Sequence, residues 1–233
     1  MKWIIILALA LTTGQAVAQE AAQGRLIVTG EGAVDSVPDM ATITMGVTSE
    51  AKTAAQAMAE TSQATAAVID ALTGAGIEPR DMQTRDLSLN PVWDNRSTGE
   101  RGIIGFQASN TVIVRVRDLP QLGGILDQVI RGGANEFRGL SFGLQEPGPA
   151  MDEARRRAVA EAMRKAALYA EAAGLTLGPV LEFTESGGSP VPMMMERAAM
   201  AMSVPIATGE VTTNTSVTMI FALDNDAGTP GLQ

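Results

Sequence analysis

The sequence predicts an α+β fold: a two-layer domain in which helices cover one side of a largely antiparallel sheet, with elements in the order ββα-ββα-βα-ββ. Two observations lead to this class. Runs in which apolar and polar residues alternate, the pattern of half-buried strands, come mostly in pairs. Alanine-rich or periodic segments with cap residues before them and glycines after them, the pattern of helices, separate these runs.

The first two predicted strands, residues 25–30 and 40–50, are joined by a segment that contains the motif Gly30-Glu31-Gly32 and Pro38. A dinucleotide-binding loop would need a third glycine at position 35 and a helix after it, but that position is Asp and a strand follows. We therefore expect a turn or bulge between two strands, in which glycine relieves crowding and proline fixes the backbone.

A helix and a second strand pair follow. Thr53 and Gln56 have the spacing of a capping box, and the alanine-rich run after them ends at Gly74 and Gly76. Strands are expected over residues 82–92 and 103–117, joined by a polar loop.

The second predicted helix is shorter. We expect Asp118 as its cap and Pro120 in its first turn, and Gly132-Gly133 ends it. A strand over residues 135–144 comes next.

The third helix is predicted over residues 150–173. One of its faces carries alanine at every fourth position, namely Ala154, Ala158, Ala162, Ala166 and Ala170. Small side chains let a helix backbone approach a sheet or a second helix closely, so we expect this face to pack against another element. Two strands, residues 180–185 and 211–223, complete the order, and the alternation of the last one predicts a half-exposed strand.

The ends of the chain predict export. Met1-Lys2, an apolar run too short to span a bilayer and the triplet Ala16-Val17-Ala18 are typical of a signal peptide over residues 1–18. The predicted organisation continues with a flexible N-terminal segment at 19–25, one domain at 26–223 with a loop at 187–209, and a flexible tail at 224–233.

The composition limits the available chemistry. The chain has no histidine and no cysteine, which excludes Ser-His-Asp triads, thiol nucleophiles and the usual zinc and haem sites. Without residues 1–18 it has sixteen basic and twenty-six acidic residues, a net charge of −10 that disfavours nucleic acid and anionic lipid as partners. This inventory does not forbid catalysis, but it leaves few groups for it. We predict no catalytic residue, no cofactor-binding residue, no metal ligand and no cofactor, and a protein that is not an enzyme.

A methionine-rich segment suggests one site. Five methionines lie between residues 193 and 202. Thioether sulfur is a soft ligand for Cu(I) and a reversible trap for oxidants. We favour the simpler interpretation, a flexible loop whose methionines pack adaptably against a neighbour.

Charged clusters suggest two further sites. Asp81 and Asp86, beside Arg80 and Arg85, have the composition of a hydrolytic carboxylate pair. Positions five apart on a strand lie on opposite faces, however, so exposed ion pairs at a loop edge are the favoured interpretation. The run Arg155-Arg156-Arg157 fans around a helix axis, which indicates a solvated helix face and not an anion site.

Short motifs distributed along the chain carry a resemblance. In chain order they are Val28-Thr29-Gly30-Glu31-Gly32, Pro38-Asp39, Gly76-Ile77 followed by Asp81 and Thr84, Pro91, Gly133-Ala134-Asn135, Ala173-Gly174, Glu185-Ser186-Gly187 and Gly209-Glu210-Val211. Their order and spacing, from about residue 26 to residue 223, resemble the SIMPL-domain family. The resemblance implies a Gram-negative periplasmic or outer-membrane-associated protein, of the kind called periplasmic immunogenic or oxidative-stress-defence proteins. It also implies an α+β fold and large ring- or channel-like homo-oligomers, and it supplies no catalytic residues.

These observations predict a non-enzymatic, self-assembling periplasmic protein that supports envelope integrity or oxidative-stress tolerance. Two alternatives stay open: a Met-loop copper or oxidant scavenger, and a carboxylate-dependent hydrolase. We expect a homo-oligomer that assembles through the apolar segment at 190–205 and the edge of the final strand. The prediction allows association with the outer membrane and includes no nucleic-acid partner.

Overall fold

The computed structural model describes residues 24–94, 102–187, 191–193 and 206–224. The elements in chain order are β1 (Gly24–Ser36), β2 (Met40–Ala51), α1 (Ala54–Gly74), the 3-10 turn η1 (Pro79–Asp81), β3 (Met82–Trp93), β4 (Ile103–Val116), the 3-10 turn η2 (Leu119–Gln121), α2 (Leu122–Arg131), β5 (Glu136–Gly143), α3 (Gly148–Ala173), β6 (Thr176–Ser186), β7 (Val191–Met193) and β8 (Glu210–Asp224). This is the predicted order with the short strand β7 added, and the α+β class is confirmed.

The strands form two antiparallel sheets, whereas the sequence pattern predicts a single sheet. In the first sheet β8 pairs with β1 on one side and with β6 and β7 on the other. In the second sheet the order is β3-β4-β2-β5. We call the first sheet with α3 the terminal lobe, and the second sheet with α1 and α2 the middle lobe.

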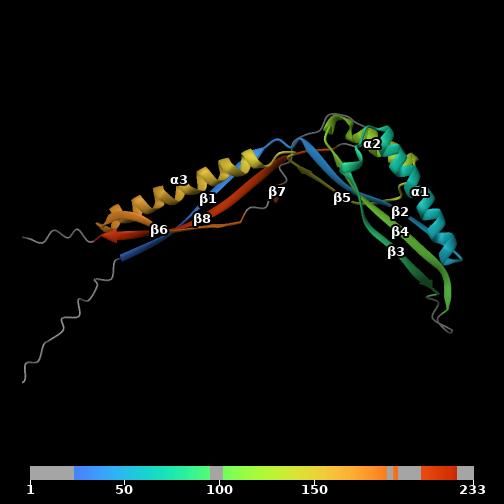
Figure 1. The fold of residues 1–233 in the computed structure, drawn as a ribbon, viewed down its shortest axis with the longest axis horizontal. Coiled ribbons are helices and arrows are strands. Elements are labelled where there is room, and N and C mark those ends of the chain that lie inside the picture. The colour runs from blue at the N-terminus through green and yellow to red at the C-terminus, as the bar shows by residue number, and fades with distance from the viewer. Residues whose placement is uncertain (1–23, 95–101, 188–190, 194–205, 225–233) are drawn as a thin grey trace, which may run out of the picture.

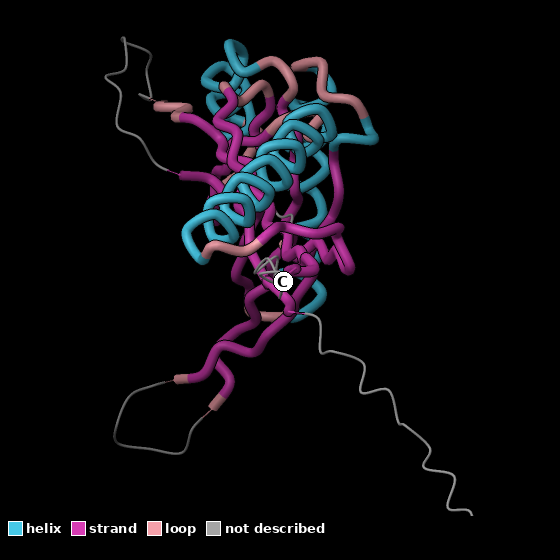
Figure 2. Tube along the Cα trace, turned by 90° about the vertical axis from the view of Figure 1, so that its left-hand side faces the viewer, coloured by secondary structure: helices cyan, strands magenta, loops and turns pink. Residues whose placement is uncertain are grey.

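The two lobes lie end to end in an elongated, bent molecule. Figure 1 shows the helices of both lobes on the convex side and the strands on the concave side. Figure 1 shows α3 lying along one side of β1, β6 and β8, and in Figure 2, turned by 90°, this helix lies nearest the viewer. Among the described residues, each sheet therefore has one helix-covered face and one uncovered face, as expected for a two-layer arrangement.

The motif Gly30-Glu31-Gly32 lies inside β1 and not in a turn, so the predicted turn is wrong at this position. The reason is the distance between β1 and α3. A Cβ atom on Gly30 would lie 2.1 Å from the Ala158 carbonyl oxygen, and one on Gly32 would lie 1.9 Å from that of Ala154. Neither distance leaves room for a side chain, so both glycines allow the strand to touch the helix backbone. The connection between β1 and β2 falls at residues 37–39 instead.

Helix α3 meets the sheet through the predicted alanine face. The five alanines of this face are all buried, and three of them form a core with Val28, Val217, Met219 and Phe221. Because small side chains lie on both sides of the contact, the helix sits unusually close to the sheet. The prediction for this face is confirmed.

One flank of α3 covers the outer edge of β1. Arg157 donates to the Ala33 carbonyl oxygen (2.7 Å) and Lys165 to that of Thr29 (3.0 Å), while the Glu31 amide donates to the Glu161 carboxylate. The helix spacing of four residues thus matches the strand spacing of two, and the backbone of each outward-facing residue of this stretch takes part in one bond, as donor at Glu31 and as acceptor at Thr29 and Ala33. These bonds occupy backbone groups that would otherwise be open to a new strand.

The middle lobe is built around large apolar side chains. Its core includes Ile43, Met45, Val68, Leu72 and Val114, all at most 2 % exposed. Helix α1 begins as predicted, with the Thr53 side chain accepting a hydrogen bond from the Gln56 amide. The cap predicted at Asp118 differs, because that residue precedes the 3-10 turn η2 and its side chain makes no cap bond to the backbone.

The final strand is not an edge. β8 pairs with β1 from Val211 to Leu223 and with β6 and β7 on its other side. The prediction that this strand offers a free edge for assembly is therefore wrong, because β1, from the other end of the chain, covers one edge of β8 while β6 and β7 cover the other. The edges of the terminal sheet are formed by β1 on one side and by β6 and β7 on the other. In the described residues, no helix is long and apolar enough to cross a membrane.

Candidate functional site

The uncovered face of the middle sheet carries a row of hydroxyl groups at its centre. Side chains alternate along β2 and β4, so the residues between the buried apolar ones point away from α1 and α2. They include Thr44 and Thr48 on β2 and Ser109 and Thr111 on β4. Hydroxyls on neighbouring central strands give this face a polar floor.

Two β-bulges place an arginine on each side of this floor. In β3 the register jumps between Thr84 and Asp86, which makes Arg85 the extra residue opposite β4. In β5 the partner of β2 changes from Gly139 to Phe137, which makes Arg138 the extra residue there. A bulge redirects the side chain that it inserts, and here both inserted side chains border the same depression.

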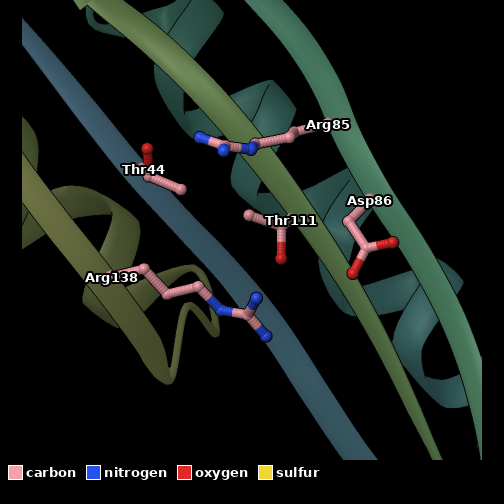
Figure 3. A pocket seen from close by; sticks show the side chains of 5 residues that line it. All are labelled: Thr44, Arg85, Asp86, Thr111 and Arg138. Carbon is pink, nitrogen blue, oxygen red and sulfur yellow. The ribbon is translucent and has the colours of Figure 1, made fainter.

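The depression has a volume of about 490 Å³ and is lined by Thr44, Arg85, Asp86, Thr111 and Arg138. Figure 3 shows the Arg85 guanidinium directed toward Thr44, and the Thr111 hydroxyl lying between the Arg138 guanidinium and the Asp86 carboxylate. The Thr111 side chain is buried and its hydroxyl has no hydrogen-bond partner. Within the described residues, the side chains of Arg85 and Asp86 also form no hydrogen bond or ion pair.

A second set of bonds holds the neighbouring groups. Glu136 accepts from Arg138 Nε (2.8 Å), from Thr48 Oγ1 (3.0 Å) and from Ser109 Oγ (3.1 Å). The bond from Arg138, followed by those from the two hydroxyls, lowers the pKa of the Glu136 carboxyl although its partial burial opposes this. Glu136 therefore stays ionised at neutral pH, and it fixes one side of the Arg138 guanidinium.

Asp81 lies elsewhere and has a different role from the predicted one. Its carboxylate accepts two hydrogen bonds of 2.7 Å from the Arg117 guanidinium, and its side chain is 3 % exposed. The hydrogen bond from Arg117 lowers the pKa of Asp81 despite the opposing effect of burial. The predicted exposed ion pair is thus wrong for Asp81, because a partner thirty-six residues away covers it, while Arg80 pairs with Glu78 at the surface.

The structure does not bring Asp81 and Asp86 together as a catalytic pair. Asp81 borders a depression lined by Arg115, Arg117 and Ile77, among others, whereas Asp86 borders the one described above. Gln145 connects this pair to the start of β2, because its side-chain amide donates to the backbone carbonyl oxygens of both Arg117 and Asp39. The Asp81–Arg117 pair therefore belongs to a structural network at the junction of the two lobes.

The remaining predicted segments give no site. Arg155, Arg156 and Arg157 are all exposed, and each pairs with a carboxylate of α3 or β6. The interpretation as a solvated helix face is confirmed. Of the methionine-rich segment, only the backbone pairing of Val191–Met193 with β8 is described, and residues 194–202 lie outside the described part of the chain.

Comparison with known proteins identifies the fold family. The model of the SIMPL family, described as a protein of unknown function (DUF541), matches residues 26–221. The chain belongs to the SIMPL family. The family resemblance drawn from the short motifs is therefore confirmed, and it covers both lobes from β1 to β8.

Other SIMPL proteins share this length. The 26 kDa periplasmic immunogenic protein of Brucella melitensis is 40% identical over 211 residues, covering 85% of this chain and 84% of the relative. The uncharacterized protein YggE of Escherichia coli K12 is 33% identical over 211 residues, covering 90% and 85%. YggE of Edwardsiella ictaluri is 37% identical over 164 residues, covering 70% and 69%.

The arginines of the depression could not be paired from the sequence. The sequence marks Arg85 only as a neighbour of Asp86, and it gives no signal that sets Arg138, Thr44 or Thr111 apart. A bulge depends on the register between two strands, which a single sequence does not reveal. The only available signal was an arginine within each of two strands that otherwise alternate.

Proposed function

We propose that this SIMPL protein resides in the periplasm and acts by self-assembly, supporting envelope integrity or tolerance of oxidative stress without a chemical step of its own. The predicted signal peptide at residues 1–18 and the name of the Brucella relative, a periplasmic protein, support the location. The absence of histidine and cysteine from the sequence supports a role that does not depend on catalysis.

The asymmetry of the terminal sheet carries the proposal of self-assembly. Along β1, three side chains of α3 bond to one outward backbone group each of Thr29, Glu31 and Ala33. Along β6, no strand pairs with the outer edge in the described residues, and no α3 side chain there bonds to the β6 backbone. One edge of this sheet is therefore closed, and the opposite one is open.

The open edge is also apolar. On β6, Val180 and Leu181 are each 44% exposed and Phe183 is 52% exposed. Met163 of α3, also 52% exposed, lies two turns beyond Arg155, which pairs with Glu185 of β6, so it faces the same flank. We call Met163, Val180, Leu181 and Phe183 the β6 flank. A row of exposed apolar residues beside an unpaired strand is typical of an association surface.

The geometry favours pairing between two copies through the β6 flank. Pro179 and two shifts of register interrupt the first half of β6, so we expect pairing mainly over residues 182–186. Because the β1 edge is closed, β6 of one copy meets β6 of a second copy in an isologous contact. Burial of apolar surface there would favour association by about 25 cal/mol per Å². The entropy lost when two copies associate opposes this gain.

Light scattering of two matched variants tests the proposal. Phe183→Lys on β6 should lower the mass of the particle by at least half, because it places a charge in the contact. Ile27→Lys changes an equally large and exposed residue, 63% exposed, on the closed strand of the same sheet, and should leave the mass unchanged. A wild-type protein that is monomeric over a wide concentration range would overturn the proposal, and so would an equal loss of mass in both variants.

The two alternatives have no comparable support. A copper or oxidant scavenger would use methionines that lie mostly outside the described residues. A hydrolase based on Asp81 and Asp86 lacks the required geometry, because the two border different depressions and Asp81 is bound by Arg117. Its lowered pKa also opposes a role as a general acid at neutral pH.

A further inference from the structure

We propose that the depression between Arg85 and Arg138 binds a small zwitterion, an α-amino acid with its ammonium and carboxylate groups close together. The inference does not depend on self-assembly. It starts from three groups that lack partners at one place. The side chains of Arg85, Asp86 and Thr111 line the same depression, and within the described residues none of these side chains has a hydrogen bond or ion pair.

The Thr111 hydroxyl is the first argument for a ligand. The residue is only 1% exposed, and its oxygen reaches neither solvent nor a protein partner. Buried hydroxyls are almost always hydrogen-bonded, because desolvation without a partner is costly. A hydroxyl at the floor of a depression between charged side chains is suited to bond a polar group that enters from outside.

The charge balance decides which kind of ligand fits. Arg138 bonds to Glu136, and the more distant Asp86 attracts it without forming a hydrogen bond or ion pair. Within the described residues, Arg85 therefore remains a positive charge and Asp86 a negative charge whose side chains have no bonded partner. A simple anion would be attracted by Arg85 but repelled by Asp86. A simple cation would be attracted by Asp86 but repelled by Arg85. The net charge of −9 for the whole chain further opposes an anion at long range. A ligand with both charges satisfies both residues.

The placement of the side chains suits an amino acid. Figure 3 shows Arg85 directed toward Thr44 at one end of the depression, and Asp86 beside Thr111 toward the other end. A carboxylate can accept two parallel bonds from the Arg85 guanidinium and one from the Thr44 hydroxyl. An ammonium group can donate to the Asp86 carboxylate and to the Thr111 oxygen. A volume of about 490 Å³ leaves room for a side chain or a second residue.

A series of three similar small molecules tests the charge requirement. L-alanine carries both charges, propionate lacks the ammonium group and ethylamine lacks the carboxylate. We expect L-alanine to shift the amide NMR signals of Thr44, Asp86 and Thr111 in the wild-type protein, with propionate and ethylamine at least tenfold weaker. Equal or tighter binding of propionate or of inorganic phosphate would overturn the proposal in favour of an anion site. No shift with any of them up to 50 mM would overturn it as well.

Three substitutions test the assignment of the residues. Arg85→Gln and Asp86→Asn should each weaken L-alanine binding at least tenfold, because each removes one of the two charged contacts. Arg80→Gln is the matched control, since Arg80 is an exposed arginine paired with Glu78 outside the depression, and it should bind as the wild type does. Circular dichroism of each variant establishes that it is folded. Unchanged binding in a folded Arg85→Gln or Asp86→Asn variant would contradict the assignment.

Discussion

The terminal and middle lobes solve the same packing problem with opposite side chains. Each lays helices on one face of an antiparallel sheet. The terminal lobe does so with glycine on β1 and alanine on α3, so that backbone lies against backbone. The middle lobe does so with interlocking large residues such as Ile43 and Leu72. The first contact has no space for an added atom, whereas the second would leave a cavity if an atom were removed.

The two kinds of packing also have different consequences for the edges of the two sheets. A helix that lies this close to β1 can reach past it, and Arg157, Glu161 and Lys165 use that reach to bond the strand edge. In the middle lobe the helices cover the face only, and the edge strands β3 and β5 carry the bulges that shape the depression. Close packing and an open polar face thus belong to different lobes.

The largest expected effect comes from adding atoms to the close contact. Gly32→Val would place Cβ 1.9 Å from the Ala154 carbonyl oxygen, and backbone cannot move aside as a flexible side chain can. Overpacking usually costs roughly 1–3 kcal/mol, and here we expect more, with α3 released from β1. Hydrogen exchange should show lost protection in β1 and α3 while β2 and α1 keep theirs.

A strand glycine in the other lobe provides the control. Gly139 of β5 has no atom within 4 Å of an added Cβ. Gly139→Val should therefore change the free energy of unfolding by less than about 1 kcal/mol. Equal losses in Gly32→Val and Gly139→Val would mean that close approach is not the reason for the glycine in β1.

Local patterns in the sequence predicted the elements, but not their long-range partners. The Thr53 cap and the alanine face of α3 were predictable because their signals lie within a few residues. The local pattern around Gly30 and Gly32 predicts a turn, because the alanines that require these glycines come more than 120 residues later. A glycine in a strand pattern signals either a bend or a close approach, and only the partner distinguishes them.

The candidate site was less predictable for the same physical reason. Arg85 and Arg138 come from strands that do not pair with each other, and each reaches the depression through a shift of register. Pairing of β1 with β8 likewise spans almost the whole domain and splits the strands into two sheets. Strand pairing depends on tertiary packing that no short motif in this chain records.

A smaller loss of stability is expected when atoms are removed from the core of the middle lobe. Leu72 of α1 is fully buried in its core, so Leu72→Ala should leave a cavity and lower the free energy of unfolding by about 3 kcal/mol. Urea unfolding monitored by circular dichroism measures this, and hydrogen exchange should place the loss in α1 and β4. Leu87→Ala on β3, where the side chain is 56% exposed, is the control and should cost under about 0.5 kcal/mol. A loss in Leu72→Ala no larger than in this control would show that the middle lobe tolerates missing atoms.

The smallest effect is expected at the junction, where charge and not packing holds the chain. Asp81→Asn should destabilise the middle lobe at pH 7, but by less than either packing variant, because the Arg117 side chain is 37% exposed and water can solvate it.

The bond from Arg117 lowers the pKa of Asp81 below its ordinary value of 3.8. The carboxylate's contribution is therefore complete above that ordinary value and is lost as the pH falls through the lower pKa of the folded state. Urea midpoints of the wild type and Asp81→Asn should differ at pH 7 and pH 5 and converge at the acidic end. Asp152→Asn, which removes an exposed ion pair with Arg155 on α3, should follow the wild type throughout. A difference between Asp81→Asn and the wild type that stayed constant down to pH 2 would show that Asp81 stabilises the junction through its shape and not through its charge.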